Sequence, residues 1–183
     1  MSLKPTNKLN PAKKLTCDTP VPASGPAAVK KKILVVDDSP QIRQSLQKVL
    51  RAEGYEVVLA ADGREGIEKF DTERLDMLLL DVCLPDISGW DVFGTATALN
   101  PFVPIIIITG RNEQHELAVL SGVGALIEKP LDVPKLLQTM AEILAEPSET
   151  HLKRLVGLHN NLRHVQPTHP VPHKVMSSVS TDR

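Results

Sequence analysis

The stretch ILVVDDSP at residues 33–40 decides the fold class, and MLLLD at 77–81 and IIIIT at 105–109 repeat its form. Each is a strand-length apolar run that ends in a polar residue. The apolar residues follow one another instead of alternating with polar ones, which is typical of strands buried on both faces. Between the first two runs, apolar residues at i, i+4, i+7 and i+8 line one face of a helix: Ile42, Leu46, Val49 and Leu50. This pattern predicts a parallel sheet with helices on both faces.

The same alternation continues along the chain and predicts five strand–helix units. The predicted strands cover residues 33–36, 55–60, 75–80, 105–108 and 125–127. The first predicted helix begins at Pro40 and ends before Gly54. The later predicted helices cover residues 62–70, 88–99, 112–121 and 132–145. About 115 residues are a common size for one domain of this kind.

Charge divides the 183 residues into three parts behind a net charge of −1. Residues 1–32 carry +6, residues 33–146 carry −10 and residues 147–183 carry +3. All five aromatic residues lie in the acidic middle, so we expect the core there. We therefore predict a disordered, basic, Pro- and Lys-rich leader over 1–31, a folded domain over 32–146, and a His- and Pro-containing tail over 147–183 with a possible short helix at 149–165.

Several classes of protein are excluded by composition. No apolar stretch approaches the roughly 20 residues that a membrane-spanning helix needs, and the N-terminus has no apolar signal segment. The two cysteines, Cys17 and Cys83, do not form the pattern of a disulfide scaffold or a cysteine metal site. We expect a cytoplasmic protein with reduced thiols. Five of the six histidines lie in the tail at irregular spacing, and we expect disorder there instead of a metal site.

Polar residues with complementary chemistry follow the predicted strands: Asp37, Asp38, Asp81, Thr109 and Lys129. The carboxyl ends of parallel strands meet at one edge of the sheet, which is where ligands bind in such folds. Three carboxylates there would repel one another by on the order of 4 kcal/mol per pair at about 4 Å, unless a cation joins them. Oxygen ligands favour Mg²⁺. With an ammonium and a hydroxyl nearby, the set suits transfer of a phosphoryl group to a carboxylate, and it predicts an aspartyl-phosphate site.

About residues 31–146 resemble the receiver domain of bacterial two-component response regulators. The resemblance is carried by ILVVDDSP at 33–40, LLLDVCLPDISGW at 78–90, IIIITG at 105–110 and EKP at 128–130. It implies a flavodoxin-like, doubly wound sheet of five parallel strands in the order 2-1-3-4-5 with five helices.

The resemblance also implies a role for each residue of the site. Asp81 would accept a phosphoryl group from a sensor histidine kinase or a histidine phosphotransfer protein. Mg²⁺ would be bound by Asp38, Asp81 and the backbone carbonyl of Cys83, and through a water molecule by Asp37. Thr109 and Lys129 would contact the acyl phosphate, and the Lys129–Pro130 peptide would be cis.

One position departs from the family pattern. Receivers commonly have Tyr or Phe three residues before the lysine, and here that residue is Leu126. The resemblance therefore leaves the aromatic part of the switch open. About 37 residues follow Glu146, too few for a DNA-binding domain, so we expect output through an unknown downstream protein that binds the fourth helix, fifth strand and fifth helix.

The expected function is a signalling domain whose only chemistry is its own phosphorylation and dephosphorylation. Two other functions are alternatives to it. A phosphohydrolase of the haloacid dehalogenase type would need an Asp-x-Asp pattern on the first strand, where this chain has Asp37 and Asp38, and an acidic pair after Lys129, where it has Asp132 alone. A degenerate receiver that acts as a constitutive scaffold would not need the acidic residues and the lysine that the chain retains.

Overall fold

The computed structural model describes residues 30–110, 118–119, 121–158 and 162–166. Residues 1–29 of the predicted leader and the end of the tail after 166 lie outside the described residues, and so do seven of the ten residues of the predicted helix at 112–121.

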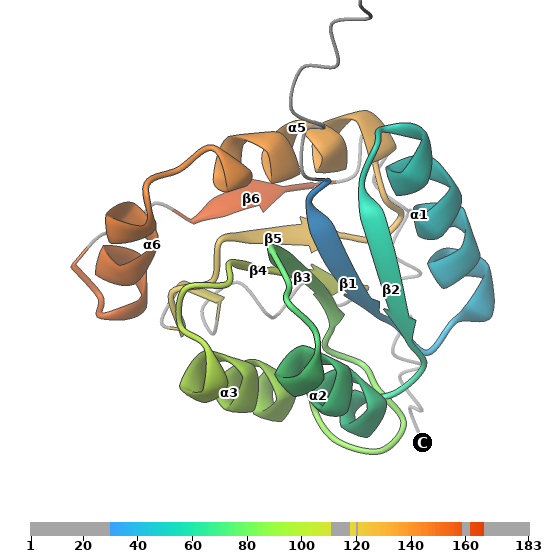
Figure 1. Cartoon of the computed structure of the whole chain (residues 1–183), viewed down its shortest axis with the longest axis horizontal. Coiled ribbons are helices and arrows are strands. Elements are labelled where there is room, and N and C mark those ends of the chain that lie inside the picture. Colours follow the sequence, from blue (N-terminus) through green and yellow to red (C-terminus); the bar gives the residue numbers. More distant parts are fainter. Residues whose placement is uncertain (1–29, 111–117, 120, 159–161, 167–183) are drawn as a thin grey trace, which may run out of the picture.

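The described residues form a parallel sheet of six strands in the order β2-β1-β3-β4-β5-β6 (Figure 1). The strands are β1 Lys32–Val36, β2 Glu56–Ala60, β3 Met77–Asp81, β4 Ile105–Thr109, β5 Ala125–Glu128 and β6 Arg163–Val165. The first five have the predicted order 2-1-3-4-5, and the flavodoxin-like fold is confirmed. The sixth was not predicted.

Helices cover both faces of the sheet, with α1 and α5 on one side and α2 and α3 on the other (Figure 1). Their bounds are α1 Pro40–Ala52, α2 Gly63–Thr72, α3 Gly89–Leu99, α5 Val133–Leu144 and α6 Ser148–Leu155. The first four of these begin after side chains that accept an amide hydrogen bond from the first turn: Ser39, Asp62, Ser88 and Asp132. None of the described helices is long and apolar enough to cross a membrane.

Alternation along the buried strands divides the core into two layers. On β1, Ile33 and Val35 pack with α1 and α5, whereas Leu34 and Val36 pack with α2 and α3. Both sets are almost fully buried, which explains why the strand sequences read as continuous apolar runs. The sheet thereby places the carboxyl ends of its inner strands between two rigid layers of helices.

The C-terminal segment differs from the predicted helix at 149–165. Helix α6 ends at Leu155, Gly157 takes a φ of 74°, and residues 163–165 pair with β5 as the parallel strand β6. A positive φ at glycine ends a helix readily, and the later apolar residues do not continue it. His151 is buried on α6 and His164 lies on β6, so the expectation of disorder is wrong for these two histidines.

Candidate functional site

The sheet brings the five predicted side chains to one edge because its inner strands end nearly level. Asp37 follows β1, Asp81 ends β3, Thr109 ends β4 and Lys129 follows β5. In the register, Val36 pairs with Leu80, Asp81 with Ile108, and Thr109 with Glu128. Carboxylate oxygens of three aspartates lie within 4.8 Å of one another: Asp37, Asp38 and Asp81. Of these, Asp37 and Asp81 are buried and Asp38 is exposed.

Local turns orient the two buried carboxylates. Oδ1 of Asp37 accepts a hydrogen bond from the amide of Ser39 at 2.8 Å, and Oδ1 of Asp81 accepts one from the amide of Cys83 at 2.9 Å. Such bonds to the amide two residues ahead are typical of Asx turns. The second oxygen of each carboxylate is therefore left to face the interior of the site.

Lys129 joins these two second oxygens. Its Nζ lies 2.8 Å from Oδ2 of Asp37 and 2.5 Å from Oδ2 of Asp81. Its amide donates to the carbonyl of Thr109 at 2.7 Å, and the peptide to Pro130 is cis, as predicted. Burial works against the charged form of Lys129, but the hydrogen bonds to Asp37 and Asp81 outweigh it and raise the pKa of the ammonium. The lysine therefore stays positive throughout the neutral range.

The site keeps an excess of negative charge. Lys129 pairs with Asp37 and Asp81, and Asp38 adds a third carboxylate beside them. Burial raises the pKa of Asp37 despite the hydrogen bonds from Lys129 and the Ser39 amide, with the charge of Asp81 adding to the rise. A carboxylate that is costly to ionise beside two others is the environment that a hard divalent cation relieves. The donor set is all oxygen, so the residues present fit Mg²⁺.

Close backbone packing holds the loop after Asp81. A Cβ atom on Gly89 would lie 2.3 Å from the carbonyl oxygen of Asp81 and 2.5 Å from the Cα of Val82. The amide of Gly89 donates to the carbonyl of Val82 at 3.2 Å. In the same loop, the carboxylate of Asp86 accepts from the amides of Gly63 and Arg64 at the start of α2. The glycine of the DISGW motif thus lets α3 begin directly against the end of β3.

Sequence reasoning missed one residue next to the site. Nη1 of Arg43 on α1 donates to the carbonyl oxygen of Asp37 at 2.5 Å, so a second cation fixes the β1–α1 turn. Arg43 stands four residues after the capping residue Ser39, but no spacing rule distinguishes it from the other polar residues of α1. Of the remaining predicted residues, Thr109 is fully buried, Cys83 is exposed and Leu126 is buried in the core.

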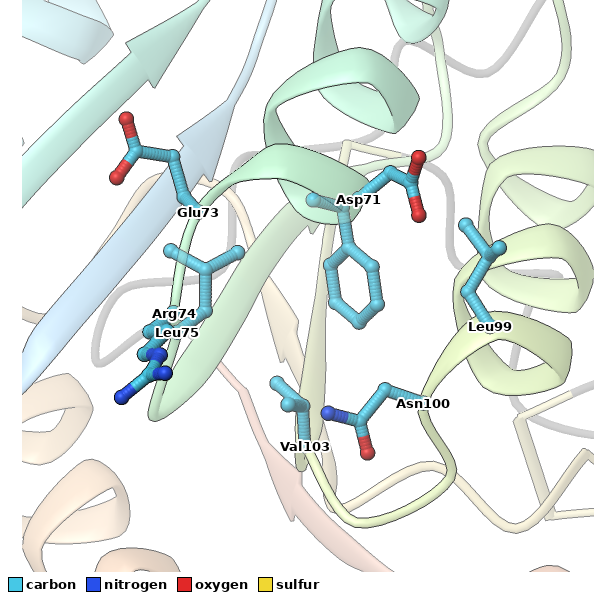
Figure 2. Close-up of a pocket in the computed structure, with 8 residues that line it drawn as sticks. Asp71, Glu73, Arg74, Leu75, Leu99, Asn100 and Val103 are labelled. Carbon is cyan, nitrogen blue, oxygen red and sulfur yellow. The ribbon is translucent and has the colours of Figure 1, made fainter.

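A groove and a pocket on the surface differ in how close they lie to the aspartate cluster. A mainly apolar groove of about 430 Å³ is lined by α1 and by the residues around Lys129 and Pro130, directly beside the site. Figure 2 shows a smaller pocket between the last turn of α2 and the end of α3, with Asp71 and Leu99 at its sides. The aspartates and the lysine described above do not line this second pocket. The groove on α1 is therefore the surface that adjoins the site.

The fold and the site together define an α/β protein with a lysine-paired aspartate cluster at the carboxyl edge of a parallel sheet. Residues 33–141 match the family model of the response regulator receiver domain, and the chain belongs to this family. The family match favours the receiver over the phosphohydrolase alternative.

Curated relatives agree with this assignment. The chain is 35% identical over 115 residues to the response regulator MprA of Mycolicibacterium vanbaalenii, covering 62% of this chain and 50% of that protein. It is 37% identical over 97 residues to the alkaline phosphatase synthesis transcriptional regulatory protein PhoP of Bacillus subtilis, covering 53% of this chain and 40% of that protein. The chain thus spans about half the length of these curated relatives or less.

Solved structures match the sheet and its helices. A CheY-like receiver domain protein from Methanospirillum hungatei superposes with a TM-score of 0.62 at 36% identity, over 66% of this chain and 98% of that one. The response regulator TrrA from Thermotoga maritima, solved in complex with Mg²⁺ and BeF, has a TM-score of 0.59 at 31% identity, over 62% of this chain and 98% of that one. The predicted class, a receiver of a two-component system, is confirmed.

Proposed function

We propose that Asp81 is the phosphoacceptor of a two-component signalling switch. The observation that carries the proposal is the position of Lys129, whose Nζ lies 2.5 Å from Oδ2 of Asp81 and 2.8 Å from Oδ2 of Asp37. Asp81 ends β3, which lies between β1 and β4, so its carboxylate has acidic and hydroxyl groups on either side. In the transfer, a carboxylate oxygen of Asp81 would bond to phosphorus while the bond from phosphorus to an imidazole nitrogen of the donor histidine breaks.

The neighbouring residues would serve this step by binding charge. Asp38, Asp81 and the backbone carbonyl of Cys83 would hold Mg²⁺, with Asp37 acting through a water molecule. When bound, Mg²⁺ would offset the charge of the carboxylates and of the incoming phosphoryl oxygens. TrrA, a structural relative, was solved with Mg²⁺ and BeF, which supports this choice of cation. Lys129 would move its ion pair from the bare carboxylate to the phosphoryl oxygens.

Thr109 would carry the change away from the site. It is fully buried at the end of β4, and its carbonyl accepts the amide of Lys129 at the end of β5. A hydroxyl that turns toward the acyl phosphate would therefore alter the packing between β4 and β5. Leu126, in the place of the usual aromatic residue, lies buried on β5 two residues before Glu128. We propose that an aliphatic side chain here replaces the aromatic part of the switch.

The groove beside the site is where we propose that a histidine kinase or phosphotransfer protein binds. Its floor is apolar, with Ile42, Leu46 and Val49 from α1 facing Pro130 and Leu131. An apolar groove that adjoins Lys129 would let a helix that bears the phosphohistidine pack against α1 and present its phosphoryl group to Asp81.

The phosphoacceptor is tested by intact-mass spectrometry after incubation with Mg²⁺ and a small-molecule phosphodonor. We expect one phosphoryl group on the unaltered chain and none on Asp81→Asn. Asp71→Asn is the matched control, because Asp71 lies exposed at the end of α2 away from the site, and it should be phosphorylated normally. No adduct on the unaltered chain, or an unchanged adduct on Asp81→Asn, would overturn the assignment.

A further inference from the structure

The outer edge of β5 and the neighbouring side of α5 form an acidic surface. Glu128 ends β5, and Glu142 and Glu146 lie on α5 and just after it. Each of the three contacts a residue of β6. Glu142 and Glu146 form ion pairs with Arg163, and Glu128 lies within hydrogen-bonding distance of the ring of His164. The edge of a sheet presents unpaired amide and carbonyl groups, which a further strand can bind. This surface is therefore complementary to an extended segment with basic side chains.

In this chain its own residues 163–165 lie on that surface. Ala125, Leu126 and Ile127 of β5 pair in parallel with Arg163, His164 and Val165. Nη2 of Arg163 lies 2.5 Å from Oε1 of Glu146, and Nε2 of His164 lies 2.7 Å from Oε1 of Glu128. Val165 packs against the core layer that includes Ile127. Backbone pairing sets the position of the segment, and the glutamates favour basic side chains on it.

The strand is held weakly compared with the edge that it covers. All three residues of β6 are only half-buried, whereas Ala125, Leu126 and Ile127 are fully buried. A strand of three residues offers few ladder bonds. The ion pair between Arg163 and Glu142 is exposed, so it contributes little to stability and is screened by salt, whereas the pair between Arg163 and Glu146 is part-buried. The preceding helix α6 is attached more firmly, because the guanidinium of Arg154 is buried against Glu146. Residues 163–165 can therefore leave the edge of β5 while α6 stays in place.

We propose that the edge of β5 and its acidic rim are a docking surface for a basic extended segment of a partner protein, and that residues 163–165 occupy this surface until the partner displaces them. Binding of a partner strand to a sheet edge derives affinity from main-chain hydrogen bonds and specificity from side-chain contacts. Here the three glutamates would select a positively charged strand. The proposal is independent of the phosphoacceptor chemistry, because it rests on a different edge of the sheet.

The first test measures amide hydrogen exchange of β5 in the full chain. Arg163→Glu places a carboxylate opposite Glu142 and Glu146, and we expect faster exchange of the β5 amides that face β6. Adding Glu142→Arg restores one opposite-charge pair and should recover part of the protection. High salt should speed exchange in the unaltered chain. Equal exchange in the unaltered chain and Arg163→Glu, at low salt, would show that the segment does not hold this edge.

The second test asks whether the exposed edge accepts a basic strand in trans. The probe is a fluorescent peptide with the sequence of residues 162–166, LRHVQ, and its control replaces the arginine with glutamate. We expect the LRHVQ peptide to bind the Arg163→Glu chain at least about tenfold more tightly than the unaltered chain. Equal binding to both chains, or equal binding of both peptides, would overturn the proposal. Dimers of the unaltered chain in sedimentation would also overturn it, because a second copy would then supply the strand.

Discussion

Two regions of the molecule use shared carboxylates in opposite ways. At the carboxyl edge of the sheet, three acidic side chains accompany one ammonium: Lys129 pairs with Asp37 and Asp81, and the carboxylate of Asp38 lies close to the other two. At the junction between α5 and the C-terminal segment, two acidic and two basic side chains alternate: Glu142, Arg163, Glu146 and Arg154. The first group carries a net charge of −2 and the second is neutral.

The difference separates a site whose charge a bound cation would balance from a group whose charges balance one another. Burial, with a smaller contribution from the charge of Asp81, raises the pKa of Asp37, so that its ionised form reduces the stability of the fold at neutral pH. Balanced charge at the junction lowers the pKa of Glu146, because the hydrogen bonds from Arg154 and Arg163 outweigh the burial that would raise it. Removing a charge should therefore have opposite effects on stability in the two regions.

The largest expected effect is at the junction. Arg154→Met removes a buried guanidinium from Glu146, and breaking a buried ion pair from one side typically costs about 3–5 kcal/mol. Hydrogen exchange of the α6 amides should report that loss. The matched control is Lys153→Met on the same helix, whose exposed pair with Glu149 should contribute almost nothing to stability. Equal effects of the two substitutions would mean that the junction is not held by its buried pair.

A glycine at the junction should give the next largest effect. Gly122 has a φ of 69°, and a Cβ atom there would lie 2.5 Å from the carbonyl oxygen of Arg154 and 2.7 Å from the Cα of Leu155. Gly122→Ala combines backbone strain with a clash against α6 and should cost about 2–3 kcal/mol in the stability of α6. Gly157→Ala is the control, because Gly157 has a similar φ of 74° but open space, and it should cost about 1 kcal/mol. Hydrogen exchange of the α6 amides measures the loss of stability in each variant and should be faster in Gly122→Ala than in Gly157→Ala.

These two regions also differ in how far the sequence predicts them. The carboxylate cluster follows apolar runs long enough to mark each strand, and parallel strands bring their carboxyl ends together, so Asp37, Asp81 and Lys129 were predictable as neighbours. Strand β6 has no such run. Arg163 and His164 are polar, and they lie on the sheet through contacts with glutamates 17 to 36 residues away in the chain. The spacing of apolar residues along the sequence does not predict such contacts.

The same reason explains why the possible helix at 149–165 is present only in its first part, and why the role of Arg43 was missed. The apolar residues between Leu152 and Val165 are compatible with a helix, but the positive φ of Gly157 divides them between α6 and β6. Arg43 bonds to a backbone carbonyl of the preceding turn, a contact that depends on the turn geometry and not on residue type.

At the carboxylate site, removing a charge should raise stability. Asp37→Asn keeps an oxygen for the Ser39 amide and removes a carboxylate that burial makes costly to ionise. We expect a gain of about 1–2 kcal/mol in the free energy of unfolding near pH 7, because the cost of burying this charge is removed and, to a smaller extent, repulsion from Asp81 is lost. The fluorescence of Trp90, the single tryptophan, would report urea unfolding of the core.

Magnesium provides the control for this substitution. A cation that binds only the folded chain raises stability as its concentration rises. Mg²⁺ should therefore stabilise the unaltered chain more than the Asp37→Asn chain and reduce the difference between them. A loss of stability in Asp37→Asn without Mg²⁺ would contradict the view that the site is strained by excess negative charge.

The smallest expected effect is a pH dependence at the junction. His151 is buried on α6, and burial, with a further contribution from the charge of Arg154, lowers the pKa of its imidazole below the usual 6.5; the Pro101 carbonyl and Glu146 oppose this. A lowered folded-state pKa means that the unfolded chain binds the proton more tightly. Stability is then fully present above about pH 6.5 and is lost as the pH falls below it.

The lowered pKa of Glu146 acts in the same direction, but only near and below its ordinary value of 4.5. Between pH 6.5 and 5 the decline should therefore come from His151, and it should total up to about 1 kcal/mol in the stability of α6. His151→Phe removes the titrating group, so hydrogen exchange of α6 should lose its pH dependence in this window after correction for intrinsic rates. If the stability of α6 fell equally with pH in His151→Phe, another group would cause the effect. The expectation that His151 is buried in its neutral form would then be wrong.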